Sequence, residues 1–292
     1  MYLWYKQAQV CYVYLEDVAL SDISWKQSFI RSRWFTRGWT LQELLAPRRV
    51  LFFDQTWNFM GTQIDLAPEI FEPTGIHEIW LREGVTPTRP SVAQKMFWAS
   101  TRNTTRVEDK AYCMLGLFGI NMPLLYGERE KAFFRLQQEI IRSTDDETIY
   151  AWTSSPFSSS QDASGMLAYS PMDFRYSSGL VQNDRQPYAS RSPVTITNKG
   201  LQFEILRVRG DGDDALTVGP EYGQNDLFAP LCCHREGDTQ RIVVLYFDLE
   251  APDLTTAHIQ RIRRVRADGL DFSAPSFNDV RLVRRTFYVN MW

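Results

Sequence analysis

The segment SRWFTRGWTLQELLAP, residues 32–47, decides how the first part of the chain is interpreted. Its apolar residues recur at close to helical spacing between positions 34 and 45, and Pro47 ends the pattern because proline does not continue a helix. Gly38 interrupts the pattern and leaves open a later helix start, near Thr40. The segment therefore predicts a helix over residues 33–45, or one that begins near Thr40.

Two short apolar runs flank this helix, VCYVYL at residues 10–15 and RVLFFD at residues 49–54. Runs that are this short and rich in β-branched and aromatic residues are typical of buried strands. The order strand, helix, strand suits a parallel βαβ unit with a right-handed crossover. We therefore expect residues 10–15 and 50–53 to form adjacent parallel strands, joined by the helix that contains Glu43.

The middle of the chain shows helical patterns after a stretch with many prolines. Residues 55–90 contain Pro68, Pro73, Pro87 and Pro90, and we expect them to be mostly loop. The helices predicted after this stretch are residues 91–102, 107–118 and 128–143. Ser91 is a suitable N-cap for the first of them, and Gly119 is a suitable C-cap for the second.

From Thr148 onward the apolar residues fall into short runs that are typical of strands. The strand candidates are residues 148–152, 194–197, 201–208, 227–233, 242–249 and 282–289. Clusters of serine, glycine and aspartate separate these runs, so the composition changes near residue 150. The chain is therefore predicted to have an α/β unit with a helical segment in residues 1–147 and a β-rich C-terminal domain in residues 148–292.

The overall composition excludes several classes of protein. With 44% hydrophobic residues and a net charge of −3 over 292 residues, the chain is neither disordered nor a basic nucleic-acid-binding module. No apolar stretch of about 20 residues predicts a membrane span. The N-terminus lacks the features of a signal peptide, and the 4 cysteines are too few and scattered for a disulfide framework. We therefore expect a cytoplasmic protein with reduced thiols.

The usual signatures of catalytic and metal sites are absent from the sequence. It has no GxGxxG after a strand, no GxxxxGK[ST], no HExxH and no GxSxG. Cys232, Cys233 and His234 are adjacent, but neighbouring residues of a strand point to opposite faces and make a poor chelate. We therefore predict no metal site and interpret these residues as the end of a strand.

Tryptophan is concentrated in the first half of the chain, where eight of the 9 residues lie at or before Trp152. Because aromatic side chains bury large areas, this half is expected to have a dense aromatic core. Trp34, Trp39 and Trp57 are interpreted as parts of that core, with stacking against a nucleobase as the alternative.

The tryptophan-rich segment resembles the fungal heterokaryon incompatibility (HET) domain family. The family's hallmark is a strand, an RGWTLQELLAP helix and then a V.FF...W...G pattern, which this chain matches through Trp57 and Gly61. Residues 91–141 and 165–174 also resemble the downstream segments of such proteins, and the last third resembles the β-rich module often appended to them. The family's opening strand, with its LS.TW-like motif, is not in this sequence, which suggests an N-terminally shortened form.

The resemblance implies a role in fungal non-self recognition and programmed cell death. Such a module acts through protein partners or self-association, and neither nucleic acid nor a membrane is expected as a partner. No cofactor is assigned with this function.

HET domains in turn look distantly like TIR domains, some of which cleave NAD. This resemblance implies that residues 1–60 form an incomplete α/β, flavodoxin-like unit. This second resemblance implies an alternative function, an NAD glycohydrolase in which Glu43 is the catalytic residue and Trp39 and Arg37 bind the nucleotide. The chemistry suits a carboxylate, because breaking the nicotinamide–ribose bond builds positive charge on the ribose. The competing interpretation of Glu43 is structural: Thr40-Leu41-Gln42-Glu43 has the T-x-x-E pattern of a capping box.

Overall fold

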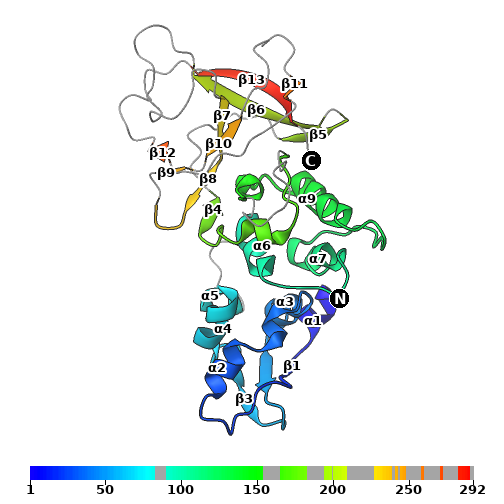
Figure 1. The fold of residues 1–292 in the computed structure, drawn as a ribbon, viewed down its shortest axis with the longest axis vertical. Helices are drawn as coiled ribbons and strands as arrows, with labels where there is room; N and C mark the ends of the chain where they lie inside the picture. The colour runs from blue at the N-terminus through cyan, green and yellow to red at the C-terminus, as the bar shows by residue number, and fades with distance from the viewer. Residues whose placement is uncertain are drawn as a thin grey trace. The chain divides into compact units, whose positions relative to one another are not determined.

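The computed structural model describes residues 1–82, 90–153, 165–182, 194–198, 200–208, 227–238, 241–242, 244–247, 258–259, 270–271 and 282–289 (Figure 1). The chain divides into two compact units. Unit 1 comprises Met1–Pro90, Lys95–Leu136 and Ser170–Ser178, and unit 2 comprises Ser91–Gln94, Gln137–Tyr169 and Gly179–Trp292. The division into domains 1–147 and 148–292 stays a prediction.

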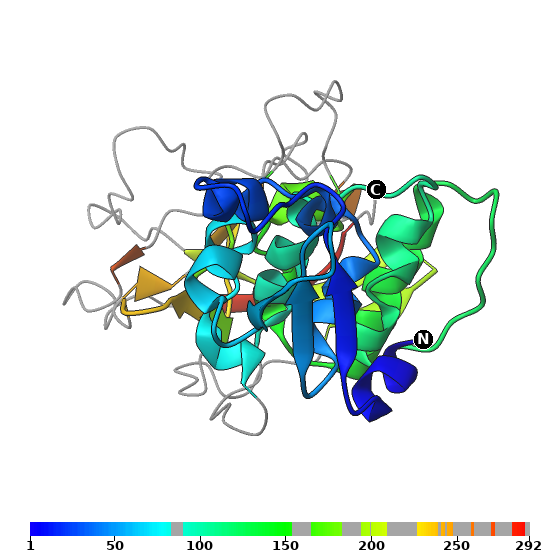
Figure 2. The same ribbon diagram turned by 90° about the horizontal axis from the view of Figure 1, so that it is seen from below.

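Unit 1 contains a three-stranded sheet in the order β1-β2-β3. The strands are β1 (Cys11–Tyr14), β2 (Val50–Phe53) and β3 (Phe59–Thr62). β1 and β2 are parallel, with Cys11 opposite Val50 and Tyr14 opposite Phe53, and they lie side by side in Figure 2. This confirms that the two apolar runs form adjacent parallel strands. β3 is antiparallel to β2.

The connection from β1 to β2 contains α2 (Trp25–Ile30), the 3-10 helix η1 (Arg33–Thr36) and α3 (Thr40–Leu45). The helical pattern of the tryptophan-rich segment is therefore divided, and its α-helix begins at Thr40. Gly38 lies at the break, where its N–H donates to the carbonyl of Asn103. The later of the two helix starts that the sequence left open is the one observed.

The two faces of this sheet have different environments. Val13, Val50 and Phe52 point to one face and are buried. On that face Phe29 of α2 and Phe35 of η1 contact Phe52, with ring centroids 5.3 and 6.4 Å away. This confirms an aromatic core in unit 1, formed by the crossover packing against the sheet.

The stretch expected to be mostly loop contains β3 and two helices, so that expectation is wrong for much of residues 55–82. The helices are α4 (Ala67–Thr74) and α5 (Glu78–Leu81). Pro68 lies in the first turn of α4, where a missing N–H breaks no helical bond. Gly75 ends α4 with φ of 63°, a left-handed conformation that glycine adopts without strain.

The remaining helices are α1 (Tyr2–Gln7), α6 (Val92–Ser100), α7 (Asp109–Tyr112), α8 (Leu115–Phe118) and α9 (Lys131–Ser143). Ser91 caps α6 as predicted, because its Oγ accepts from the Gln94 N–H while Gln94 Oε1 accepts from the Ser91 N–H. The single helix predicted over 107–118 is divided into α7 and α8. Gly119 follows α8 with φ of 68°, which confirms it as a C-cap.

Among its described residues, unit 2 contains a six-stranded sheet, two two-stranded sheets and the 3-10 helix η2 (Glu147–Tyr150). Its described strands are β4 (Leu180–Gln182), β5 (Thr195–Thr197), β6 (Gly200–Val208), β7 (Leu227–Pro230), β8 (Cys233–Arg235), β9 (Arg241–Ile242), β10 (Val244–Phe247), β11 (His258–Ile259), β12 (Leu270–Asp271) and β13 (Leu282–Val289). Antiparallel pairing of β6 with β13 runs from Leu201–Val289 to Val208–Leu282. The described chain is thus a mixed α/β structure.

The strand predicted at residues 148–152 is wrong. Residues Glu147–Tyr150 form the 3-10 helix η2, and a further 3-10 helix, η3, spans Pro171–Phe174 in unit 1. Asp146 begins η2, because its carboxylate accepts from the Thr148 N–H and turns the chain. The apolar run at Ile149, Tyr150 and Trp152 is buried, which explains why it resembles a strand in sequence.

Candidate functional site

Glu43 lies on α3 and is half buried. Its Oε1 accepts a hydrogen bond of 3.1 Å from the Tyr5 hydroxyl of α1. The N-cap of α3 is Trp39, without a side-chain capping bond, and Thr40 Oγ1 donates to the carbonyls of Trp34 and Arg37 instead. The capping-box interpretation of Glu43 is therefore wrong, because Thr40 is already inside the helix.

The surroundings of Glu43 keep two neighbouring acids protonated. Burial, followed by the Glu43 carboxylate, raises the pKa of Tyr5 to about 12 and the pKa of the Cys11 thiol to about 11. Tyr5 precedes β1 and Cys11 begins it, so Glu43 lies near the amino end of this strand. In open α/β sheets, ligands bind outside the carboxyl ends of the strands. Glu43 lies at the other end, near the start of β1.

Arg102 is a buried cation of unit 1 that no sequence pattern indicated. It is 6% exposed and donates to the carbonyls of Trp98 and Arg37 and to Thr40 Oγ1, at 2.9–3.1 Å. Burial lowers the pKa of Arg102 to about 10, although the nearby Cys113 and Glu43 act to raise it. Arg102 thus binds α6 to the tryptophan-rich segment. Local sequence has no signal for this link, because Arg37 and Thr40 lie more than 60 residues away.

The other two predicted site residues flank the start of α3. Arg37 follows η1 and has an exposed side chain, while its carbonyl accepts from Arg102 and Thr40. Trp39 is half buried. The structure therefore places Arg37, Trp39 and Glu43 on one short segment, and the nucleotide-binding role of the first two stays a prediction.

Trp57 is not in the core, so that expectation is wrong. Its side chain is 61% exposed and its ring stacks on Tyr14 with centroids 4.9 Å apart. Tyr12, Phe53 and Phe59 extend the same cluster, with ring centroids 5.7 Å apart between neighbours. We call these five residues the aromatic face, because they lie on the sheet face opposite the crossover helices. Trp34, by contrast, is half buried against Phe35 and Phe52.

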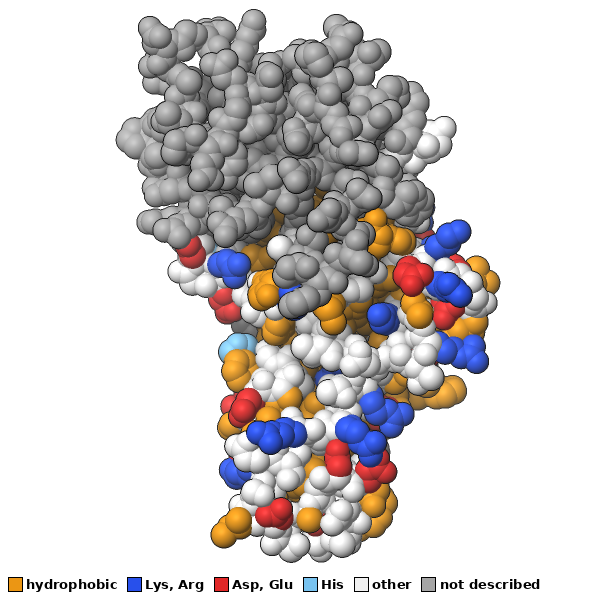
Figure 3. All heavy atoms as spheres, viewed as in Figure 1, with side chains coloured by type: hydrophobic (Ala, Val, Ile, Leu, Met, Phe, Trp, Pro, Cys, Tyr) orange, Lys and Arg blue, Asp and Glu red, His pale blue; other side chains and the backbone are white. Residues whose placement is uncertain are grey.

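The surface shown in Figure 3 carries hydrophobic, acidic and basic side chains interspersed over the described residues. It has no single broad basic area, consistent with the balanced composition. Among the described helices, none combines the length and the apolar character that crossing a bilayer requires.

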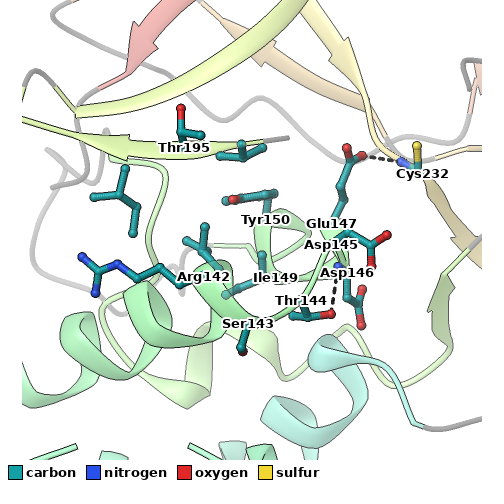
Figure 4. Close-up of a pocket in the computed structure, with 13 residues that line it drawn as sticks. Arg142, Ser143, Thr144, Asp145, Asp146, Glu147, Ile149, Tyr150, Thr195 and Cys232 are labelled. Atoms are coloured by element: carbon teal, nitrogen blue, oxygen red, sulfur yellow. Dashed lines mark hydrogen bonds between the residues drawn. The ribbon is translucent and has the colours of Figure 1, made fainter. Parts of the chain in front are cut away.

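Unit 2 has an open pocket of about 650 Å³ at the end of α9 (Figure 4). Its acidic side chains already serve the fold. Asp146 accepts from the N–H groups of Val92 and Thr148, and Glu147 accepts from the Cys232 N–H. The pocket therefore presents side chains that are engaged in structural hydrogen bonds, and we assign no chemistry to it.

Cys233 and His234 begin β8, and Cys232 lies between β7, which ends at Pro230, and β8. The interpretation of these residues as the end of one strand is therefore wrong. The 4 cysteines of the chain are free. Within the part of the chain that the structure describes, no group of three His, Cys, Asp or Glu residues is placed to hold a metal ion.

The chain is similar to the vegetative incompatibility protein HET-E-1 of Podospora anserina, with 46% identity over 147 residues. The aligned part is 48% of this chain and only 11% of that relative. No family model and no solved structure matches the chain. The similarity supports the heterokaryon incompatibility family for this chain, which is the family that its tryptophan-rich segment resembles.

Proposed function

We propose that this chain acts in heterokaryon incompatibility, as a module of non-self recognition and cell-death signalling that works through protein contacts. The observation that carries the proposal is the 46% identity to a vegetative incompatibility protein. The match covers 11% of that relative. The proposal therefore concerns this module alone and not the activity of the whole relative.

The aromatic face supports a role in protein contacts. Tyr12, Trp57 and Phe59 are each more than half exposed, although large aromatic side chains gain most free energy when they are buried. Aromatic residues are enriched in the energetically dominant parts of protein interfaces. An exposed cluster of this kind therefore suits a surface that a protein partner covers.

Regulated expression in a filamentous fungus tests the proposal. We expect growth arrest and uptake of a vital dye when the full chain is induced, and normal growth with Gly38→Ala, which places a Cβ against Thr104 Cγ2 and disturbs the tryptophan-rich segment. Immunoblotting controls for protein amount. Normal growth with abundant, folded wild-type protein would overturn the proposal.

We also propose that the parallel pair β1-β2 belongs to a flavodoxin-like unit related to TIR domains, followed by a β-rich C-terminal domain. The order of strand, crossover helices and strand supports the first part. The NAD-cleaving alternative for Glu43 has no support from the similar protein, and it stays a prediction with its own test in the Discussion.

A further inference from the structure

We draw no further inference here: the strongest candidate, the aromatic face on the exposed side of the β1-β2-β3 sheet, carries none, because nothing in the structure shows what covers it.

Discussion

The phenol of Tyr5 donates a hydrogen bond to the carboxylate of Glu43 across 38 residues of sequence. It joins α1 to α3, the helix of the tryptophan-rich segment. Glu43, the catalytic candidate, therefore has a hydrogen-bond partner in α1. Substitution of Tyr5 tests what this bond contributes to the stability of the fold, and substitution of Glu43 tests its chemistry.

Tyr5→Phe should change how stability depends on alkaline pH. The pKa of Tyr5 is raised to about 12 by burial and then by Glu43, so the folded state holds this proton more tightly than the unfolded state. Its contribution is fully present below pH 10 and is lost as the pH rises towards 12. Urea unfolding at about pH 8 and about pH 11 should show a smaller loss of stability for Tyr5→Phe than for the wild type.

Tyr12→Phe, which alters an exposed ring, is the control for that experiment. It should lose as much stability as the wild type over the same interval. Identical pH profiles for Tyr5→Phe and the wild type would show that the Tyr5–Glu43 hydrogen bond does not couple to folding.

The NAD-cleaving alternative predicts a specific effect of Glu43→Gln. The amide can still accept from Tyr5, so the melting temperature should stay close to that of the wild type. Loss of the charge would raise the barrier by about 2.7–4 kcal/mol if the carboxylate stabilises a ribosyl cation. We expect no nicotinamide release by the purified chain. Release by the wild type that Glu43→Gln abolishes would establish the alternative, and equal release by both would exclude Glu43.

Arg102→Met should destabilise unit 1 strongly. The substitution keeps an apolar stem but leaves the carbonyls of Trp98 and Arg37 without their charged donor. Hydrogen bonds to charged groups contribute about 1.5–3 kcal/mol, so we expect the free energy of unfolding to fall by about 2–4 kcal/mol. Arg106→Met, at an exposed arginine over the ring of Tyr126, should cost less than about 1 kcal/mol. Equal effects in chemical denaturation would contradict a special role of Arg102.

Gly38→Ala tests why glycine stands in the tryptophan-rich segment. An added Cβ would clash with Thr104 Cγ2 and lie 3.2 Å from Cys113 Sγ. We expect a loss of about 1–3 kcal/mol, as is typical when a filled space is overpacked. Gly179→Ala is the control, because nothing lies within 4 Å of its added Cβ. Thermal melting that ranks the two variants in the opposite order would show that Thr104 moves aside freely.

Local sequence patterns were sufficient for the elements that their own residues determine. The runs at 10–15 and 49–54 are strands, and the crossover between them is helical, because apolar periodicity and proline act over a few residues. Ser91 and Gly119 bound helices for the same reason, since a cap satisfies main-chain groups of the adjacent turn. The tryptophan-rich segment also indicated the family, which the similarity to a vegetative incompatibility protein supports.

Tertiary contacts decided the rest. The run at 148–152 resembles a strand in sequence. In the structure the Asp146 carboxylate accepts from the Thr148 N–H, and Glu147–Tyr150 form η2. Trp57 looks like a core residue in sequence, but the turn after β2 places it on the exposed face. Glu43 satisfies a capping-box spacing, yet it pairs with Tyr5. In each case the deciding partner or packing surface is absent from the local pattern, because hydrogen bonds and burial depend on which distant segments the fold brings together.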